Sequence, residues 1–334
     1  MGQDNYVVPD SIDYAGRAGL FRAPVTGDIL IDDADVMFNG ACDENTSWYN
    51  YCYLGRYASF ADADDDGEAD LLLGSAYGAA LFLAPFEAEV SYEDAPVAVF
   101  DEFGYEIDDF SFVGDIDGDG LPDVAGSYRT DTGDLEVVVY FAPLSGVYRA
   151  SDASAVASTE EHWVYLVYGP VADYNGDGYL DTTYLRDVSG TGTLSVSLGP
   201  LTGDVAVDTL TTTFEAPEVG YFGNSAAALD DLNGDGCAEL VIGAPQFGGG
   251  GSSPEGPGAA FVFFGPLSSA MTNADADQVL SGDGDDAFGA DVANIADVDG
   301  DGFVDLAVTG TGDDDGGTDA GAVWLYSGVD LLGG

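Results

Sequence analysis

The chain has 334 residues, of which 62 are acidic and only six are basic, and its formal net charge at pH 7 is −56. This charge excludes ordinary nucleic-acid binding, which needs basic surfaces, and it disfavours contact with anionic membranes. Apolar residues make up 46% of the chain, enough for a sizeable core, and the 48 glycines indicate many tight turns and few long helices.

The N-terminal 45 residues read as part of a repeat that is complete later in the chain. Residues 5–10 resemble a strand, and residues 19–27 contain an apolar strand that runs into Ala-Pro. Met1 is followed by polar residues rather than by the apolar core of a secretory signal, and no stretch is apolar and long enough to span a bilayer. We therefore expect a soluble domain that has been processed or excised.

An irregular segment follows, in which Cys42 and Cys52 lie close in sequence. They predict either a disulfide, if the protein is secreted, or two reduced cysteines. Trp48 and its aromatic neighbours up to Tyr53 form either a contact surface or the packing of this loop. His162 is the only histidine, and no nucleophile motif accompanies it, so a hydrolytic triad is not indicated.

Five acidic segments with one shared pattern organise the rest of the chain. They are ADADDDGEADLLLG (61–74), GDIDGDGLPDVAGS (114–127), ADYNGDGYLDTTYL (172–185), DDLNGDGCAELVIG (230–243) and ADVDGDGFVDLAVTG (296–310). After each segment an apolar strand runs into Ala-Pro or Gly-Pro, at 81–86, 138–146, 195–203 and 261–269, and a last copy at 323–328 lacks the proline. A unit of about 55 to 60 residues with this order suits a four-stranded blade.

Blades that cannot bury both faces alone stack around an axis. The sequence thus predicts an all-β fold, a β-propeller of four-stranded antiparallel blades with cation-binding hairpin loops, and six blades are favoured over seven. A single domain spans 1–334 in this interpretation, with units at approximately 1–45 (partial), 46–100, 101–160, 161–215, 216–282 and 283–334.

Each acidic loop reads D-x-[DN]-x-D-G-x-x-[DE], and we number its residues 1 to 9. Oxygen ligands at positions 1, 3, 5 and 9, with the main-chain carbonyl of position 7, form a cage for a hard cation, and Gly at position 6 permits the sharp turn. In chain order the predicted ligands are Asp62, Asp64, Asp66, Glu68 and Asp70 in loop 1; Asp115, Asp117, Asp119, Leu121 and Asp123 in loop 2; Asp173, Asn175, Asp177, Tyr179 and Asp181 in loop 3; Asp231, Asn233, Asp235, Cys237 and Glu239 in loop 4; and Asp297, Asp299, Asp301, Phe303 and Asp305 in loop 5.

These loops differ from EF-hands, which need a Glu at position 12 and flanking helices, because an apolar strand begins directly after position 9. Ordinary Asp-Gly surface turns are the alternative, but five copies in register favour metal. Ligands that are all oxygen predict about five Ca²⁺ ions, ahead of Mg²⁺ or Mn²⁺, in a structural rather than a catalytic role. The acidic runs 283–286 and 313–315 indicate solvated turns or a further cation site.

Short motifs flank the loops. Phe222-Gly223 precedes loop 4 and Gly243-Ala244-Pro245 follows it, Phe288-Gly289 and Phe103-Gly104 precede loops 5 and 2, and the first unit has Arg56-Tyr57 instead. With these motifs the chain resembles the FG-GAP repeats of integrin α-subunit propellers and of their bacterial, VCBS-like relatives. The resemblance implies a propeller with Ca²⁺ in hairpin loops on one face, ligand binding usually on the other, and a role in adhesion.

These features together predict a calcium-stabilised extracellular or cell-surface module that binds a protein or a glycan, with no nucleic-acid partner, no membrane insertion and no enzymatic activity. The alternatives are a propeller-scaffold enzyme, such as a polysaccharide lyase or hydrolase, and a structural assembly unit. An enzyme predicts a deep acidic or aromatic pocket, whereas an adhesin predicts a broad, shallow face.

Overall fold

The structure is a computed structural model of the whole chain. It describes residues 2–3, 17–21, 34–40, 54–75, 78–91, 94–100, 107–130, 132–159, 165–188, 191–216, 220–249, 256–267, 269–318 and 320–333. Five predicted features lie outside these ranges: the strand at 5–10, the Cys42–Cys52 pair, the aromatic segment 48–53, the Phe103-Gly104 motif and His162.

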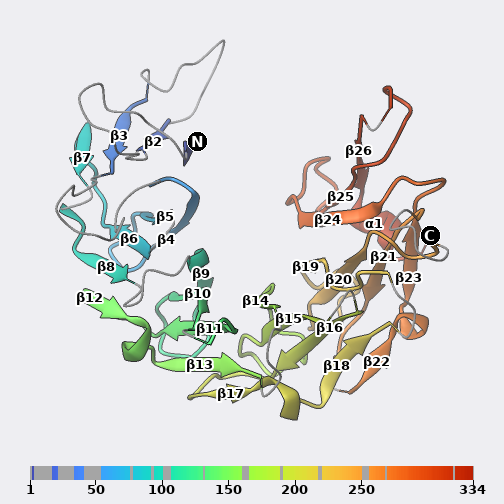
Figure 1. Cartoon of the computed structure of the whole chain (residues 1–334), viewed down its shortest axis with the longest axis horizontal. Coiled ribbons are helices and arrows are strands. Elements are labelled where there is room, and N and C mark those ends of the chain that lie inside the picture. Colours follow the sequence, from blue (N-terminus) through green and yellow to red (C-terminus); the bar gives the residue numbers. More distant parts are fainter. Residues whose placement is uncertain are drawn as a thin grey trace. The chain divides into compact units, whose positions relative to one another are not determined.

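Strands dominate the described ranges, which confirms the all-β prediction. The described ranges contain 26 short strands, three 3-10 helices and one α-helix of four residues, α1 (Gly328–Leu331) (Figure 1). None of the helices in these ranges has the length and apolar character needed to cross a membrane. The chain divides into two compact units, one of residues 1–158 with 202–205 and the other of residues 159–201 with 206–334.

The first unit contains three sheets, which we number in chain order. Sheet 1 has the order β1-β2-β3-β7, sheet 2 the order β12-β8-β6-β5-β4, and sheet 3 the order β17-β13-β11-β10-β9. The strands are β1 (Gly2–Gln3), β2 (Arg17–Leu20), β3 (Val36–Asn39), β4 (Tyr57–Ala61), β5 (Asp70–Ser75), β6 (Gly78–Phe82), β7 (Glu89–Ser91), β8 (Val97–Phe100), β9 (Ile107–Gly114), β10 (Asp123–Arg129), β11 (Leu135–Tyr140), β12 (Gly146–Arg149), β13 (Ala155–Ser158) and β17 (Val205–Ala206), with η3 at Ala150–Asp152.

The second unit contains the other three sheets. Sheet 4 has the order β14-β15-β16-β18-β22, sheet 5 the order β19-β20-β21-β23, and sheet 6 the order β24-β25-β26. The strands are β14 (Tyr165–Tyr168), β15 (Thr182–Val188), β16 (Thr191–Ser197), β18 (Thr212–Glu215), β19 (Ser225–Leu229), β20 (Glu239–Ala244), β21 (Ala259–Phe263), β22 (Met271–Thr272), β23 (Gln278–Ser281), β24 (Phe288–Asn294), β25 (Leu306–Gly310) and β26 (Ala322–Tyr326), with η4 at Val207–Thr209 and η5 at Asn273–Asp275.

Each acidic loop joins the first two strands of one sheet, as the sequence predicted. The joined strands are antiparallel in all five cases: β4 and β5, β9 and β10, β14 and β15, β19 and β20, and β24 and β25. The strand that follows each loop is an inner strand of its sheet, with a neighbour on each side, so position 9 of each loop is held at a buried strand end.

Sheets 2, 3 and 4 have five strands each instead of the four predicted for a blade. The extra strand comes from the next repeat: β12 pairs in parallel with β8 in sheet 2, β17 lies beside β13 in sheet 3, and β22 pairs in parallel with β18 in sheet 4. In the four-stranded sheet 1, β7 pairs in parallel with β3 in the same way. An outer strand exposes unpaired main-chain groups, and a short segment of the following unit satisfies them.

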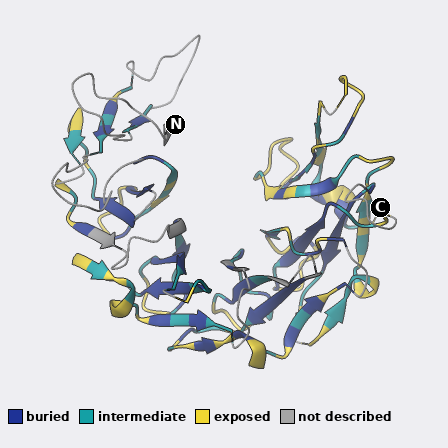
Figure 2. Ribbon diagram, in the orientation of Figure 1, coloured by how far each residue is buried: buried dark blue, intermediate teal, exposed yellow. Residues whose placement is uncertain are grey.

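The core lies between consecutive sheets within each unit. All six residues of β20 and all five of β21 are buried, and Figure 2 shows buried residues concentrated along the central strands of the sheets. One hydrophobic cluster joins Leu194 and Phe214 of sheet 4 to Ile242 and Phe261 of sheet 5. Burial on both faces explains why these strands are continuously apolar instead of alternating.

Candidate metal centres in five acidic loops

The position 1 aspartate organises each loop by accepting several main-chain amides. In loop 2, Asp115 Oδ1 accepts from Gly118 at 2.8 Å and from Asp119 at 2.9 Å, while Oδ2 accepts from Gly120 at 2.8 Å. Loops 3, 4 and 5 repeat all three bonds, and loop 1 repeats those from positions 5 and 6. The carboxylate thus curls the loop around itself.

Two positions of the loop have left-handed backbone, whereas the sequence argument identified only position 6. At position 6 the φ angle is +97° for Gly120, with no heavy atom near an added Cβ, so glycine is required there by conformation and not by space. At position 4, four loops also have glycine with positive φ, and loop 1 has Asp65 at +61°. Aspartate is one of the few other residues that tolerates this region.

The carboxylates at positions 3 and 5 each commit one oxygen to the main chain. In loop 2, Asp117 Oδ1 accepts from the Asp119 amide at 3.0 Å, and Asp119 Oδ1 accepts from the Leu121 amide at 2.9 Å. The bond from the position 7 amide to the position 5 carboxylate recurs in all five loops. These bonds fix the direction of each side chain and leave its second oxygen for another partner.

The position 9 acid is the most buried acid of the loop. Its exposed fraction is 0% in loops 1 to 4 and 2% in loop 5. In loop 2, Asp123 Oδ2 accepts from the Ile116 amide at 3.0 Å, and Oδ1 accepts from Ala142, the residue before Pro143, at 2.8 Å. The same pair of bonds is made by Asp70, Asp181 and Asp305, with Ala84, Gly199 and Gly328 as the distant donors.

This carboxylate therefore fastens the loop to the end of the third strand of its sheet. From the sequence, position 9 is predicted to be a ligand only, and the Ala-Pro and Gly-Pro turns form a separate signature. Their recurrence at a fixed place after each acidic loop was the signal that the two belong together. In loop 4, Glu239 Oε1 accepts from the Leu232 amide at 3.0 Å, whereas the buried Oε2 has no hydrogen bond of good geometry, although the Gly265 amide interacts with this carboxylate.

Burial raises the pKa of three of these acids, those of loops 2, 3 and 4. Loss of solvation raises the pKa of Asp123 and of Asp181 to about 6, although the main-chain amides that they accept oppose the shift. Burial likewise raises the pKa of Glu239 to about 7, and it raises the pKa of Asp117. The pKa of the exposed Asp64 is raised by partial desolvation in the loop and by the neighbouring carboxylates of Asp66 and Asp70. A cation beside these groups would favour their ionised forms and reverse the shifts.

Position 2 connects the loop to the following sheet within each unit. The fully buried Tyr174 of loop 3 packs in the cluster of Leu240 and Phe263 from sheet 5, and Leu232 of loop 4 packs with Leu306 of sheet 6. Main-chain bonds reinforce the first contact, since the amides of residues 238 and 267 donate to the carbonyls of residues 173 and 174, both at 2.8 Å.

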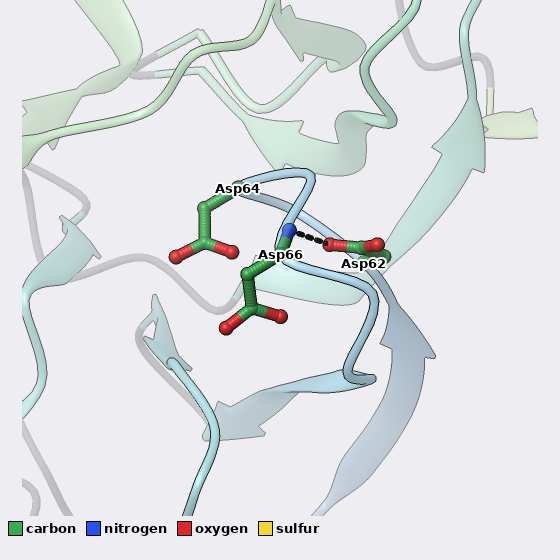
Figure 3. A group of neighbouring side chains, drawn as sticks. All are labelled: Asp62, Asp64 and Asp66. Atoms are coloured by element: carbon green, nitrogen blue, oxygen red, sulfur yellow. Dashed lines mark hydrogen bonds between the residues drawn. The ribbon is translucent and has the colours of Figure 1, made fainter.

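Three loops bring acidic oxygens together closely enough to share an ion. Ligand oxygens within 4.8 Å of one another are offered by Asp62, Asp64 and Asp66 in loop 1, by Asp115, Asp117 and Asp123 in loop 2, and by Asp297, Asp299 and Asp305 in loop 5. Figure 3 shows the loop 1 group, with the bond from the Asp66 amide to Asp62 drawn as a dashed line. Two oxygens on opposite sides of a Ca²⁺ ion lie about 4.6 to 5.2 Å apart, so this spacing fits calcium.

Loops 3 and 4 have Asn at position 3 and therefore fewer acidic groups. Asn175 Nδ2 donates to Asp177 Oδ2, and Asn233 Nδ2 donates to Asp235 Oδ2, both at 3.0 Å. In loop 5 the outer oxygen of Asp301 accepts a bond of 2.7 Å from the Ser327 hydroxyl, a contact that no motif predicted. The donor set in every loop is all oxygen apart from these amide nitrogens, as a hard cation requires.

A separate cavity of about 480 Å³ lies in the second unit, beside sheet 6. The acidic runs predicted as solvated turns line it, at Asp283, Asp285 and Asp286 and at 313–315, together with Trp324 and Tyr326. Aromatic rings and carboxylates thus meet in one concave place outside the five loops.

Comparison with known proteins agrees with the repeat. Residues 222–263, which run from the Phe222-Gly223 motif through loop 4 to the end of β21, match the FG-GAP repeat family. Integrin alpha-3 of Cricetulus griseus is 37% identical over 94 residues, which cover 28% of this chain and 9% of that protein. Integrin alpha-4 of Xenopus laevis is 37% identical over 123 residues, which cover 36% of this chain and 11% of that protein.

Integrin alpha-IIb of Mus musculus is 28% identical over 236 residues, which cover 65% of this chain. The chain spans only 9 to 21% of the length of these relatives. Among solved structures, an exotype rhamnogalacturonan lyase aligns at a TM-score of 0.39 with 14% identity, over 86% of this chain and 58% of that one, and a score this low supports no inference. The sequence matches thus show an FG-GAP repeat at residues 222–263, in a chain that is similar to integrin alpha subunits and repeats the same acidic loop five times.

Proposed function

We propose that this chain is a calcium-stabilised propeller that serves as an extracellular or cell-surface binding module in adhesion. The observation that carries the proposal is the acidic loop itself, because one hydrogen-bonded arrangement recurs five times and presents carboxylate oxygens at ion-binding distances in loops 1, 2 and 5. The sequence similarity to integrin alpha subunits supports the adhesion part.

About five Ca²⁺ ions are proposed, one for each loop. The side chains at positions 1, 3, 5 and 9 and the carbonyl at position 7 are the proposed ligands. A bound Ca²⁺ would neutralise carboxylates that otherwise repel each other within one short loop. The geometry of the loop comes from its own residues, since the position 1 aspartate shapes the turn and the position 9 acid fastens it to the sheet.

The six sheets are the proposed blades of a single propeller, with sheet 1 as the partial N-terminal unit. Two facts support this assignment. Sheets that follow one another within a unit pack face to face, and a short strand of one repeat pairs with the outer strand of the sheet before it. Both features are those of a repeat that is stable only as an array.

A protein or a glycan is the proposed ligand, because the charge of −56 opposes binding to nucleic acid and to anionic membranes. Immobilised protein should bind members of a glycan array or a panel of extracellular matrix proteins in millimolar calcium and should lose that binding in chelator. Asp119→Asn is the control variant for the chelator experiment, because it removes one proposed ligand charge from loop 2 and leaves the other four loops unchanged. Absence of binding to both panels in calcium would argue against an adhesion module.

A second function, an enzyme acting on polysaccharide, is favoured by one observation. The 480 Å³ cavity combines carboxylates with Trp324 and Tyr326, and sugar-binding sites use such combinations. Release of new reducing ends or of unsaturated sugars from acidic and neutral polysaccharides would reveal this activity. Substitution of Trp324 by Ala should abolish such release if the cavity is responsible, whereas the loop 2 control should not.

A further inference from the structure

Position 3 divides the five loops into two groups. Loops 1, 2 and 5 have aspartate there, and these are the three loops in which acidic oxygens converge within 4.8 Å. Loops 3 and 4 have Asn175 and Asn233. The difference changes both the charge of the loop and its internal hydrogen bonding.

Two bonds fix the orientation of the amide in loop 3. Asn175 Oδ1 accepts from the Asp177 amide at 2.8 Å, and Nδ2 donates to Asp177 Oδ2 at 3.0 Å. Loop 4 has the same pair, in which Asn233 Oδ1 accepts at 2.9 Å and Nδ2 donates at 3.0 Å. The outer oxygen of the position 5 carboxylate therefore already has a donor in both loops.

A cation must displace that donor. An amide nitrogen carries hydrogens and no free acceptor, so Nδ2 cannot itself become a ligand and has to leave the carboxylate when an ion arrives. The Ser327 hydroxyl at Asp301 of loop 5 is different, because a hydroxyl can rotate and present its oxygen to the ion. Loop 5 thus keeps its full set of oxygen ligands.

We propose that the five loops form two affinity classes, a tight class of loops 1, 2 and 5 and a weak class of loops 3 and 4, set by the residue at position 3. The inference rests on the proposed function, since it requires that the loops bind calcium. Loss of one ligand charge and of one hydrogen bond to a carboxylate weakens loops 3 and 4 by roughly tenfold to a hundredfold.

Calorimetric titration of the chelator-stripped full chain with Ca²⁺ tests the division. The wild type should bind in two steps, about three tight ions and then about two weak ones. Asn175→Asp should move one ion from the weak step to the tight step, and Asn233→Asp should do the same. The matched reverse variant, Asp117→Asn in loop 2, should move one ion from the tight step to the weak step.

Terbium luminescence assigns the loop. Tb³⁺ replaces Ca²⁺ at oxygen sites and is sensitised by a nearby tyrosine, and Tyr179 at position 7 of loop 3 is 47% exposed. The part of the luminescence that is lost on Tyr179→Phe reports ion binding to loop 3. This part should saturate during the weak binding step in the wild type, and during the tight binding step in the Asn175→Asp variant.

Each outcome decides the proposal. Five equivalent ions in the wild type would overturn the two classes while leaving calcium binding in place, and so would an Asp117→Asn variant that keeps three tight ions. No heat of binding at any loop would overturn the proposed function and the inference with it. If an Asn→Asp variant fails to fold, the wild-type steps and the Asp117→Asn variant still give the answer.

Discussion

Replacement of Asp123 by Asn separates the structural role of position 9 from its proposed role as a ligand. In the native loop, Oδ1 accepts from the Ala142 amide at 2.8 Å and Oδ2 from the Ile116 amide at 3.0 Å, and the side chain is completely buried. An Asn side chain has one oxygen, so its NH₂ group must face one of these main-chain donors.

The magnitude follows from the two groups affected. One hydrogen bond to a neutral acceptor is lost, worth about 0.5 to 1.5 kcal/mol, and the amide left unpaired in a buried place adds about 1 to 3 kcal/mol. Burial raises the pKa of Asp123 to about 6, so the ionised carboxylate itself costs stability at higher pH. We therefore expect Asp123→Asn to lower the free energy of unfolding by about 2 kcal/mol or more in urea melts at about pH 5, where the carboxyl is mostly protonated, with excess chelator present throughout.

Asp119→Asn is the matched control, because Asp119 is exposed and accepts only the Leu121 amide, a bond that the Asn oxygen can keep. In chelator it should change stability by no more than about 0.5 kcal/mol, as is usual for exposed positions. In calcium both variants should lose stability relative to the wild type. Equal stability of Asp123→Asn and the wild type in chelator would refute the fastening role of position 9.

Three further predictions concern the same loops. In chelator, melts across pH should show stability falling as pH rises from about 4 to 7. Burial raises the pKa of Asp123 and Asp181 to about 6 and that of Glu239 to about 7, so the folded state holds protons that the unfolded state releases. Added calcium, which binds the ionised forms, should reverse this slope, and a slope that is unchanged by calcium would contradict the account. Tyr174→Ala should lower the free energy of unfolding by about 3 to 5 kcal/mol in urea melts, because a fully buried ring between sheets 4 and 5 is removed. Tyr174→Phe loses only the 3.3 Å bond to the carbonyl of residue 170 and should lower it by about 1 kcal/mol. Gly120→Ala should lower the free energy of unfolding by about 1 to 2 kcal/mol, because the φ angle at this position is +97°. Gly203→Ala, where space is equally open and φ is not positive, should leave it unchanged in the same melts. Equal effects of the two variants would show that backbone conformation is not the cause.

The repeat made most of the local structure readable from the sequence. The pattern from position 1 to position 9 placed each loop between two strands, and the continuous apolar runs after it, such as 239–244, are buried on both faces in the structure. These features depend on local residue types and on burial, and both leave direct marks in the order of residues.

Other features depend on partners distant in sequence. The bond from the residue 142 amide to Asp123 joins two separate motifs, and the parallel pairing of β12 with β8 joins two repeats, so neither has a local signature. The left-handed position 4 was hidden because loop 1 carries Asp65 there instead of glycine. The donor role of Asn175 was missed because Asn and Asp were treated as interchangeable oxygen ligands.

Removal and return of calcium tests the central claim most directly. The full chain, stripped with chelator and melted at increasing calcium concentrations, should become more stable by about 2.7 kcal/mol for each site at a free concentration 100 times its dissociation constant. Calorimetry on the same sample should give about five ions bound per chain. A melting temperature that does not respond to calcium, or fewer than about three bound ions, would contradict the claim that cations hold these loops.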